Sequence, residues 1–207
     1  MENDVAGPDF FAVAGSQRAC RAFRPDPVPA ALITKVLIAA THAPSAENRQ
    51  PWVFVVVREE GARAAVGALM RRAWEGGARA FEEGRLEPHL LADVDRGATG
   101  GVSAAPVLIV VAGDSERAHP ATLASSVFPA VQNLLLAAAA CGLGSALTTL
   151  AVAFGDELGG LLQMPATIKP LAVVPLGWPA RPLGPPRREP IETRAHDGIF
   201  GRPWAGA

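Results

Sequence analysis

The chain has 207 residues, of which 49% are hydrophobic and 19% are charged, and its formal net charge at pH 7 is −1. This composition is typical of one globular domain with a substantial core and excludes a disordered chain. A net charge so close to zero gives no basis for expecting nucleic acid or an anionic membrane surface as a partner.

The cysteines and the first residues bear on the cellular compartment. Cys20 and Cys141 are far apart and belong to no CxxC or Cys/His pattern, which argues against a disulfide framework and a zinc site. The opening residues, MENDVAGPDFF, are acidic and lack the basic-then-apolar layout of a secretion signal. We therefore expect a cytoplasmic protein that holds no metal.

Two helices and a strand are predicted in the first quarter of the chain. A short helix is expected over 9–15, and a second begins at Pro29 with apolar residues at helical spacing. The second helix must end near His42, because Pro44 disfavours helical geometry in the residue before it. The apolar, β-branched run over 52–57 has the composition and length of a strand.

The 59–97 segment is rich in Ala, Arg and Glu, which favours one or two surface helices. Glycines at Gly76, Gly77 and Gly84 are expected to interrupt them.

Further strands and helices are predicted in the second half. They are a strand over 106–112, an apolar helix over 121–141, an extended segment over 146–152, a short helix over 156–162 and a strand over 171–177. Asp156 is expected to cap the short helix, and Pro175 favours an edge strand or a bulge. From residue 179 on, the chain is rich in Pro and Arg without helical or strand periodicity.

The longest apolar stretch has the length of a membrane span. No Lys, Arg, Asp or Glu occurs between Arg117 and Asp156. However, Pro129, Gln132 and Asn133 interrupt the stretch, and no basic cluster flanks it to set an orientation. We therefore predict no membrane span, but a helix buried on all sides.

The order of elements predicts the fold class. Strands separated by helices, without even βαβ spacing, indicate a single α+β domain over 1–207. The chain has no GxGxxG after a strand and no GxxxxGK[ST], which excludes the Rossmann and P-loop phosphate cradles.

Two segments carry residues suited to binding a cofactor. In QRACRAFR (17–24), Arg18 and Arg21 are three residues apart and suited to gripping one phosphate, although solvated surface arginines give the same pattern. In APSAENRQPW (43–52), hydroxyl and amide groups crowd a Pro-bounded turn. Such groups suit a heterocycle edge or a ribityl chain, although the segment also reads as a plain turn.

Four motifs together resemble the FMN-dependent nitroreductase family. APSAENRQPWVFVVV looks like the family's APSaxNxQPWxFvvv signature, and QRACRAF is similar to its RRSxRxF. VQNLLLAAAACGLGSALTTL resembles its long interface helix followed by GLGS, and VVPLGWPARPLGPPRREP resembles its strand, G[YW]P and terminal RxP. These matches run in the family's order from about residue 17 to 190.

The resemblance implies a homodimer with FMN at the interface. It implies a central, mainly antiparallel sheet flanked by helices, and a tail (179–207) that embraces the partner subunit. The chemistry would occur at flavin N5, so no side chain is named as catalytic. The residues implied to bind FMN are Arg18, Arg21, Pro44, Ser45, Asn48, Gln50, Leu147, Thr148, Thr149 and Arg188, with Arg187 as the alternative to Arg188. The 59–97 segment would form a variable substrate lid, with Trp74, Phe81 and His89 as substrate contacts.

The activity implied is hydride transfer from NAD(P)H through FMN to a nitroaromatic, a quinone or an enone. Three alternatives stay open: a flavin-dependent oxidase or dehydrogenase of a specific metabolite, a non-catalytic flavin or deazaflavin carrier, and a silent scaffold. The scaffold is considered because Gln17 and Ala19 stand where the family usually has Arg and Ser. Losing one hydroxyl-to-phosphate bond costs on the order of 1 kcal/mol, which weakens FMN retention without abolishing it.

Overall fold

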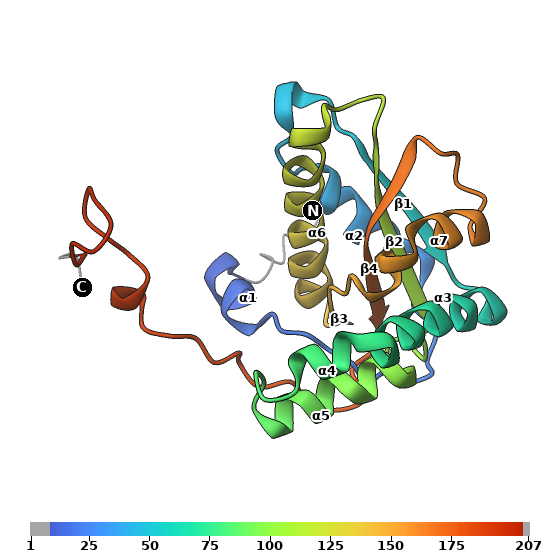
Figure 1. The fold of residues 1–207 in the computed structure, drawn as a ribbon, viewed down its shortest axis with the longest axis horizontal. Coiled ribbons are helices and arrows are strands. Elements are labelled where there is room, and N and C mark those ends of the chain that lie inside the picture. The colour runs from blue at the N-terminus through green and yellow to red at the C-terminus, as the bar shows by residue number, and fades with distance from the viewer. Residues whose placement is uncertain (1–8, 205–207) are drawn as a thin grey trace, which may run out of the picture.

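A four-stranded antiparallel sheet forms the centre of the protein in the computed structural model, which describes residues 9–204 (Figure 1). The strands are β1 (Trp52–Val57), β2 (Val107–Asp114), β3 (Gly144–Ser145) and β4 (Ile168–Gly177). Their order is β1-β2-β4-β3, and each neighbouring pair is antiparallel. The predicted α+β class and the three longer strands are therefore confirmed.

Seven α-helices accompany the sheet within the described residues. They are α1 (Phe10–Ser16), α2 (Ala30–Thr41), α3 (Glu60–Ala73), α4 (Arg79–Glu82), α5 (Pro88–Arg96), α6 (Pro120–Ala140) and α7 (Gly155–Leu161). Short π-helical turns follow α3 (Trp74–Ala78) and α5 (Gly97–Gly101), and 3₁₀ turns lie at Ala46–Asn48, Leu150–Phe154 and Ile191–Thr193.

The sheet is covered on both faces, which explains why its central strands are apolar without alternation. Ile109 and Val111 pack in one hydrophobic cluster with residues of α2 and α6. Leu108 and Val110 point the opposite way and pack in a second cluster with residues of α3 and α7. The domain therefore has three layers, with α2 and α6 on one face of the sheet and α3 and α7 on the other (Figure 1).

The predicted interruptions of the 59–97 segment are confirmed. Gly77 has φ 141° and Gly84 has φ 79°, backbone conformations that other residues rarely adopt. The segment accordingly breaks into α3, α4 and α5, and in Figure 1 the two later helices lie side by side at the end of the molecule near β3.

Two local predictions in the second half were wrong. The 146–152 segment is not extended throughout: Thr148 forms a bridge with Val173, and a 3₁₀ turn begins at Leu150. Asp156 does not cap α7, because the 3₁₀ turn runs directly into that helix and places Phe154 at the cap position, with Asp156 in the first turn.

Pro175 lies neither on an edge strand nor at a bulge. It is part of β4, between β2 and β3, and faces Leu108 in regular register. The peptide groups of Val173 exchange hydrogen bonds with Thr148, on the side of β4 away from β2. Pro175 is two residues further along, so its nitrogen lies on that side as well and no hydrogen bond to β2 is lost.

The prediction that α6 is buried on all sides was wrong. Its inner face contributes eight buried residues to the core, but Phe128 is exposed, and Leu136 and Ala137 line a groove on the outer face. By length and composition α6 is the only described helix capable of crossing a membrane, and 44% of its most apolar 18-residue window is buried inside this chain. It is a core helix whose inner face is buried in this chain and whose outer face is also largely apolar.

The tail leaves the body of the domain. It starts beside the 17–24 segment, where the Ala180 N–H donates to the Ala22 carbonyl, and then extends away (Figure 1). Its far end is a small turn in which His196 stacks edge-on against Phe200, and Phe200 is 92% exposed. Contact with a partner stays a prediction, and residues 205–207 of the predicted tail lie outside the described residues.

Candidate functional site

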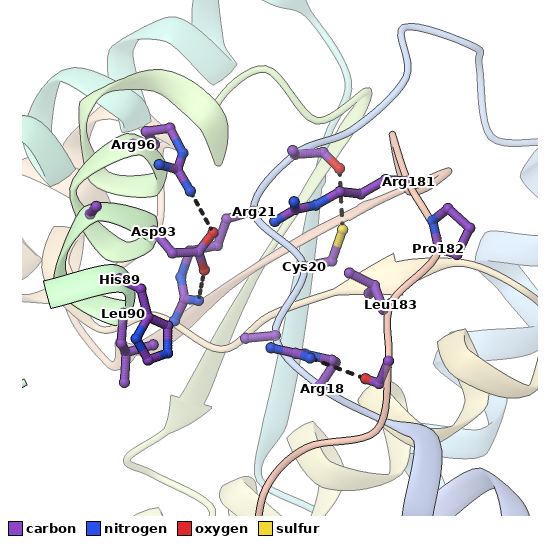
Figure 2. Close-up of a pocket in the computed structure, with 14 residues that line it drawn as sticks. Arg18, Cys20, Arg21, His89, Leu90, Asp93, Arg96, Arg181, Pro182 and Leu183 are labelled. Carbon is purple, nitrogen blue, oxygen red and sulfur yellow. Dashed lines mark hydrogen bonds and ion pairs between the residues drawn. The ribbon is translucent and has the colours of Figure 1, made fainter. Parts of the chain in front are cut away.

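A cationic pocket of about 530 Å³ lies between the 17–24 segment, α5 and the start of the tail (Figure 2). Four arginines line it: Arg18, Arg21, Arg96 and Arg181. The only carboxylate in its lining is that of Asp93, so the pocket carries an excess of positive charge. Arg18 and Arg21 therefore line the same pocket. Planar guanidinium groups gathered in this way suit a phosphate, and the identity of the ligand stays a prediction.

Hydrogen bonds link the three parts of the chain that line this pocket. Arg18 Nη1 donates to the Gly184 carbonyl at 3.1 Å, which links the 17–24 segment to the tail. Arg21 Nη1 donates to Asp93 Oδ2 at 2.7 Å, and Arg96 Nη2 donates to Asp93 Oδ1 at 3.2 Å. The Asp93 carboxylate therefore lies between the guanidinium groups of Arg21 and Arg96.

Cys20 anchors the same segment to the sheet. Its backbone N–H donates to the Ser145 carbonyl on β3, and its thiol donates to the Ala22 carbonyl at 3.3 Å. A Cβ atom at Gly144 would lie 2.6 Å from Cys20 Sγ, so the second glycine of Gly-Leu-Gly-Ser permits this close approach. Burial raises the pKa of the Cys20 thiol, which therefore stays protonated and has a structural role.

A second, apolar pocket of about 420 Å³ adjoins the first, and Arg21 lines both. Several residues singled out from the sequence line it together: Trp74, Phe81, Leu147, Thr148 and Thr149. Met70, Leu86 and Val94 add apolar surface to it. His89, the third residue predicted in the lid, lines the cationic pocket instead.

Trp74 and Phe81 differ in their accessibility. Trp74 is buried, and its indole N–H donates to Asp95 Oδ1 at 2.9 Å. Phe81 is 61% exposed, with the Arg85 guanidinium 4.2 Å from its ring centroid. Phe81 can therefore change position at the mouth of the apolar pocket, whereas Trp74 forms a fixed part of its wall.

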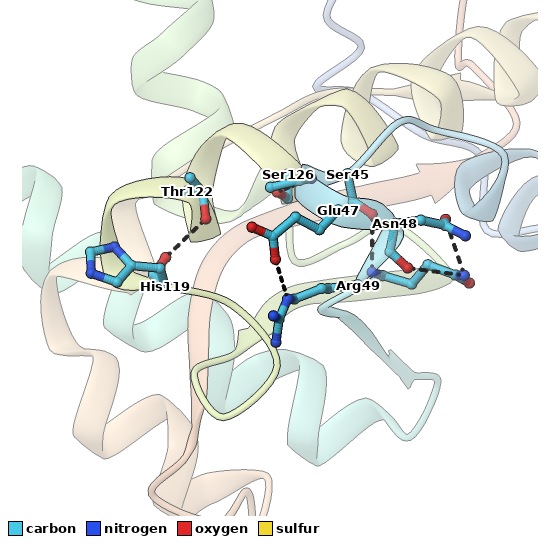
Figure 3. Close-up of polar contacts among 9 residues, drawn as sticks. Ser45, Glu47, Asn48, Arg49, His119, Thr122 and Ser126 are labelled. Carbon is cyan, nitrogen blue, oxygen red and sulfur yellow. Dashed lines mark hydrogen bonds and ion pairs between the residues drawn. The ribbon is translucent and has the colours of Figure 1, made fainter.

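The amide loop (residues 44–50) has a strained backbone. Glu47, Asn48 and Gln50 have φ values of 54°, 55° and 50°, in the left-handed region that L-residues seldom adopt. The loop is held by the Gln50 N–H, which donates to Ser45 Oγ at 3.0 Å, and by the Ala46 N–H, which donates to Ser126 Oγ of α6 at 3.1 Å (Figure 3). Strain maintained by specific bonds is typical of functional loops.

The amide loop and the cationic pocket lie at opposite ends of α6. The loop contacts the first half of that helix, whereas the 17–24 segment is bonded to β3, which follows the end of the helix (Figure 1). Pro44, Ser45, Asn48 and Gln50 therefore do not meet Arg18 and Arg21 within one chain.

The arginine at the start of the tail was missed in the sequence. Arg181 follows the Gly-Trp-Pro turn and lines the cationic pocket, while Arg188 is exposed and donates to the carbonyl of its neighbour Arg187. Neither Arg187 nor Arg188 lines the pocket. One signal could have found it: Arg181 comes shortly after β4, and the chain leaving β4 is hydrogen-bonded to the 17–24 segment.

The nitroreductase family model matches residues 14–178, which include the amide loop, the apolar pocket and the part of the cationic pocket that precedes the tail, but not Arg181. The chain belongs to the nitroreductase family. A protein of Methanothermobacter thermautotrophicus named as an NADH dehydrogenase/NAD(P)H nitroreductase is 32% identical over 188 residues, covering 89% of this chain and 84% of that protein. A Thermus thermophilus NADH dehydrogenase is 30% identical over 207 residues, covering 93% and 97%.

A solved structure with bound flavin shares the fold. Oxidized iodotyrosine deiodinase bound to FMN and 3-iodo-L-tyrosine has a TM-score of 0.72 and 26% identity, covering 88% of this chain and 97% of that one. Family membership and this similarity establish a nitroreductase-fold oxidoreductase.

Proposed function

We propose that this protein is an FMN-dependent oxidoreductase that transfers hydride from NAD(P)H to a small organic acceptor of the nitroaromatic, quinone or enone class. The observation that carries the proposal is the position of Arg21 in the wall shared by a cationic and an apolar pocket. A ligand with a phosphate at one end and a flat ring at the other matches that pair of pockets.

The cationic pocket fits the phosphate end of FMN. Arg18, Arg21 and Arg181 offer several N–H donors in a partly enclosed space, and charge-assisted bonds of this kind are roughly twice as strong as neutral ones. The pocket has this positive charge although Gln17 and Ala19 stand where the family usually has Arg and Ser. We assign the phosphate to these three arginines and keep Arg188 as an outer candidate.

The apolar pocket fits the ring and the acceptor. When bound, FMN would supply the two-electron chemistry, taking hydride at N5 from NAD(P)H and passing it to the acceptor. The Thr148 N–H is already bonded to the Val173 carbonyl, so we assign the stabilisation of negative charge on the ring to the N–H of Thr149. Trp74 and Phe81, from the proposed 59–97 lid, would exclude water from the acceptor.

A second subunit would complete the site. Because the amide loop lies far from its own chain's cationic pocket, we propose that Ser45, Asn48 and Gln50 reach the flavin bound by the partner. The outer groove, lined by Phe10, Val13, Ile38, Leu136, Ala137 and Ala140 among others, supplies an apolar surface for dimer formation. The tail is the other candidate contact.

The visible spectrum of the purified protein supplied with FMN tests the proposal. We expect bound flavin whose absorption bands bleach under anaerobic conditions with NADPH or NADH. Bound flavin that neither nucleotide bleaches would favour a flavin oxidase or a non-catalytic carrier. Absence of bound flavin would favour the scaffold.

A pair of variants tests the phosphate assignment separately. Replacing Arg18 and Arg21 together by Ala should abolish flavin retention. Arg24→Ala is the matched control, because Arg24 pairs with the exposed Asp26 and does not line the cationic pocket. Full flavin content in the double variant would contradict the assignment.

A further inference from the structure

Asp93 is the one acidic residue in a pocket otherwise suited to anions, and its position calls for an explanation. Its carboxylate bonds Arg21 at 2.7 Å and Arg96 at 3.2 Å, and Figure 2 shows it between these two side chains. The two side chains of the shorter pair are only 22% and 30% exposed, so this pair is shielded more than an ordinary surface ion pair.

The backbone around Arg21 is fitted closely to α5. A Cβ atom at Gly97 would lie 2.6 Å from Arg21 Cδ, and one at Gly101 would lie 2.4 Å from the Arg21 carbonyl oxygen. The stem of Arg21 is therefore packed against the turn that follows α5, and Asp93 holds the guanidinium at the other end. A long side chain fixed at both ends has lost most of its rotamer freedom before any ligand arrives.

We propose that Asp93 is a positioning residue, which holds the Arg21 guanidinium in the wall between the two pockets so that it is preorganised for an anionic phosphate. The inference rests on the proposed FMN site and adds a residue on the lid segment to it. The Asp93 bond uses one Nη1 N–H of Arg21, and a guanidinium has five N–H donors, so others are left for the ligand.

The sign of the effect separates positioning from competition. By Coulomb's law the carboxylate repels a phosphate bound nearby, so a simple competitor would weaken FMN binding, and its removal would strengthen it. Removing a positioning residue has the opposite effect and weakens FMN binding. Without Asp93, the Arg21 side chain would become ordered only when the ligand binds, and the entropy lost in that step reduces the affinity.

The test compares the affinities of the purified protein for FMN and for riboflavin, which lacks the phosphate. We expect Asp93→Ala to weaken FMN binding by about three- to tenfold and to change riboflavin binding by less than about twofold. Asp93→Asn keeps an acceptor oxygen for Arg21 and should lose less affinity. Asp26→Asn makes the same charge change at the exposed Arg24–Asp26 pair and should bind both flavins like the wild type.

A double variant tests whether Asp93 acts through Arg21. If it does, Asp93→Ala should add little to the loss already caused by Arg21→Ala. Additive losses, an unchanged or tighter FMN affinity in Asp93→Ala, or equal losses for FMN and riboflavin would each overturn the proposal.

Inorganic phosphate separates this inference from the proposed function. Phosphate should raise the melting temperature of the flavin-free wild type, and it should do so less in Asp93→Ala. A protein that responds in this way but binds no FMN would refute the flavin assignment and retain the positioning role. A wild type that neither phosphate nor FMN stabilises would refute both.

Discussion

The indole N–H of Trp74, a residue that lines the apolar pocket, donates a hydrogen bond to Asp95 Oδ1 at 2.9 Å, which links the end of α3 to α5. The Trp74 bond, with a further contribution from Arg79, holds the pKa of the Asp95 carboxyl below its ordinary value. The bond and the ionised carboxylate therefore stabilise each other.

The first prediction concerns the pH dependence of that bond. A carboxyl whose pKa is lowered by folding contributes stability above its unfolded pKa of about 4 and loses it as the pH falls through the lowered folded value. Asp95→Asn should therefore melt at a lower temperature than the wild type at neutral pH, and the difference should shrink below about pH 4. Thermal unfolding between pH 7 and pH 3 measures it. A difference independent of pH would show that the charge of Asp95 is irrelevant.

The second prediction compares two arginines. Arg181 lines the cationic pocket, whereas Arg188 is exposed and bonded to a neighbouring carbonyl. Loss of a charged hydrogen bond costs about 1.5–3 kcal/mol, so Arg181→Ala should weaken FMN binding by about tenfold or more. Arg188→Ala should change it by less than about twofold, with Arg187→Ala as a further control. The reverse ranking in a flavin titration would mean that the tail folds back onto the cofactor.

The third prediction concerns a glycine behind Arg21. A Cβ atom at Gly101 would lie 2.4 Å from the carbonyl oxygen of Arg21 and 3.0 Å from that of Arg96. Because both neighbours are backbone atoms, Gly101→Ala should lower the free energy of unfolding by roughly 2 kcal/mol or more. Gly160 in α7 has open space around it, so Gly160→Ala should be neutral or stabilise by about 0.5–1 kcal/mol. Denaturant unfolding measures the free energy of unfolding of both variants. Equal values would argue against close packing of Gly101 on the Arg21 carbonyl.

The fourth prediction addresses the oligomeric state. Light scattering at micromolar concentration should give twice the 21.5 kDa mass of one chain. Ile38 is 54% exposed in the outer groove, and a buried carboxylate there is costly, so Ile38→Glu should shift the protein towards the monomer. Leu161→Glu changes a residue of α7 that is 39% exposed and lies outside the groove, and it should remain dimeric. A wild-type monomer would contradict the dimer, and a dimeric Ile38→Glu would place the interface elsewhere.

Strands β1, β2 and β4 were predictable because their composition reflects the environment of the whole strand. Each is a run of mostly β-branched and apolar residues of strand length. The central strands β2 and β4 are buried on both faces, which leaves little place for polar residues, and the edge strand β1 is half-buried. The helix breaks at Gly77 and Gly84 were predictable for a similar local reason, because few other residues tolerate those backbone angles.

The contacts that shape the pocket were not predictable in the same way. Arg21 and Asp93 are 72 positions apart, and Asp93 lies in a helix that also carries Asp95 and Arg96, so nothing in the sequence distinguishes it from other charged residues on a surface helix. The open face of α6 escaped prediction because composition reports how apolar a helix is, and not which face its neighbours cover. Arg181 enters the site only because β4 ends beside the 17–24 segment.

The separation of the amide loop from the cationic pocket has a genetic consequence for a dimeric enzyme. In the proposed dimer, an Arg21→Ala subunit disrupts the phosphate half of the site that it holds itself, and an Asn48→Ala subunit disrupts the amide-loop half of the site that its partner holds. When the two are expressed together, a mixed dimer places both lesions in one site and leaves the second site intact. Two inactive alleles should therefore complement each other, with up to one functional flavin per mixed dimer.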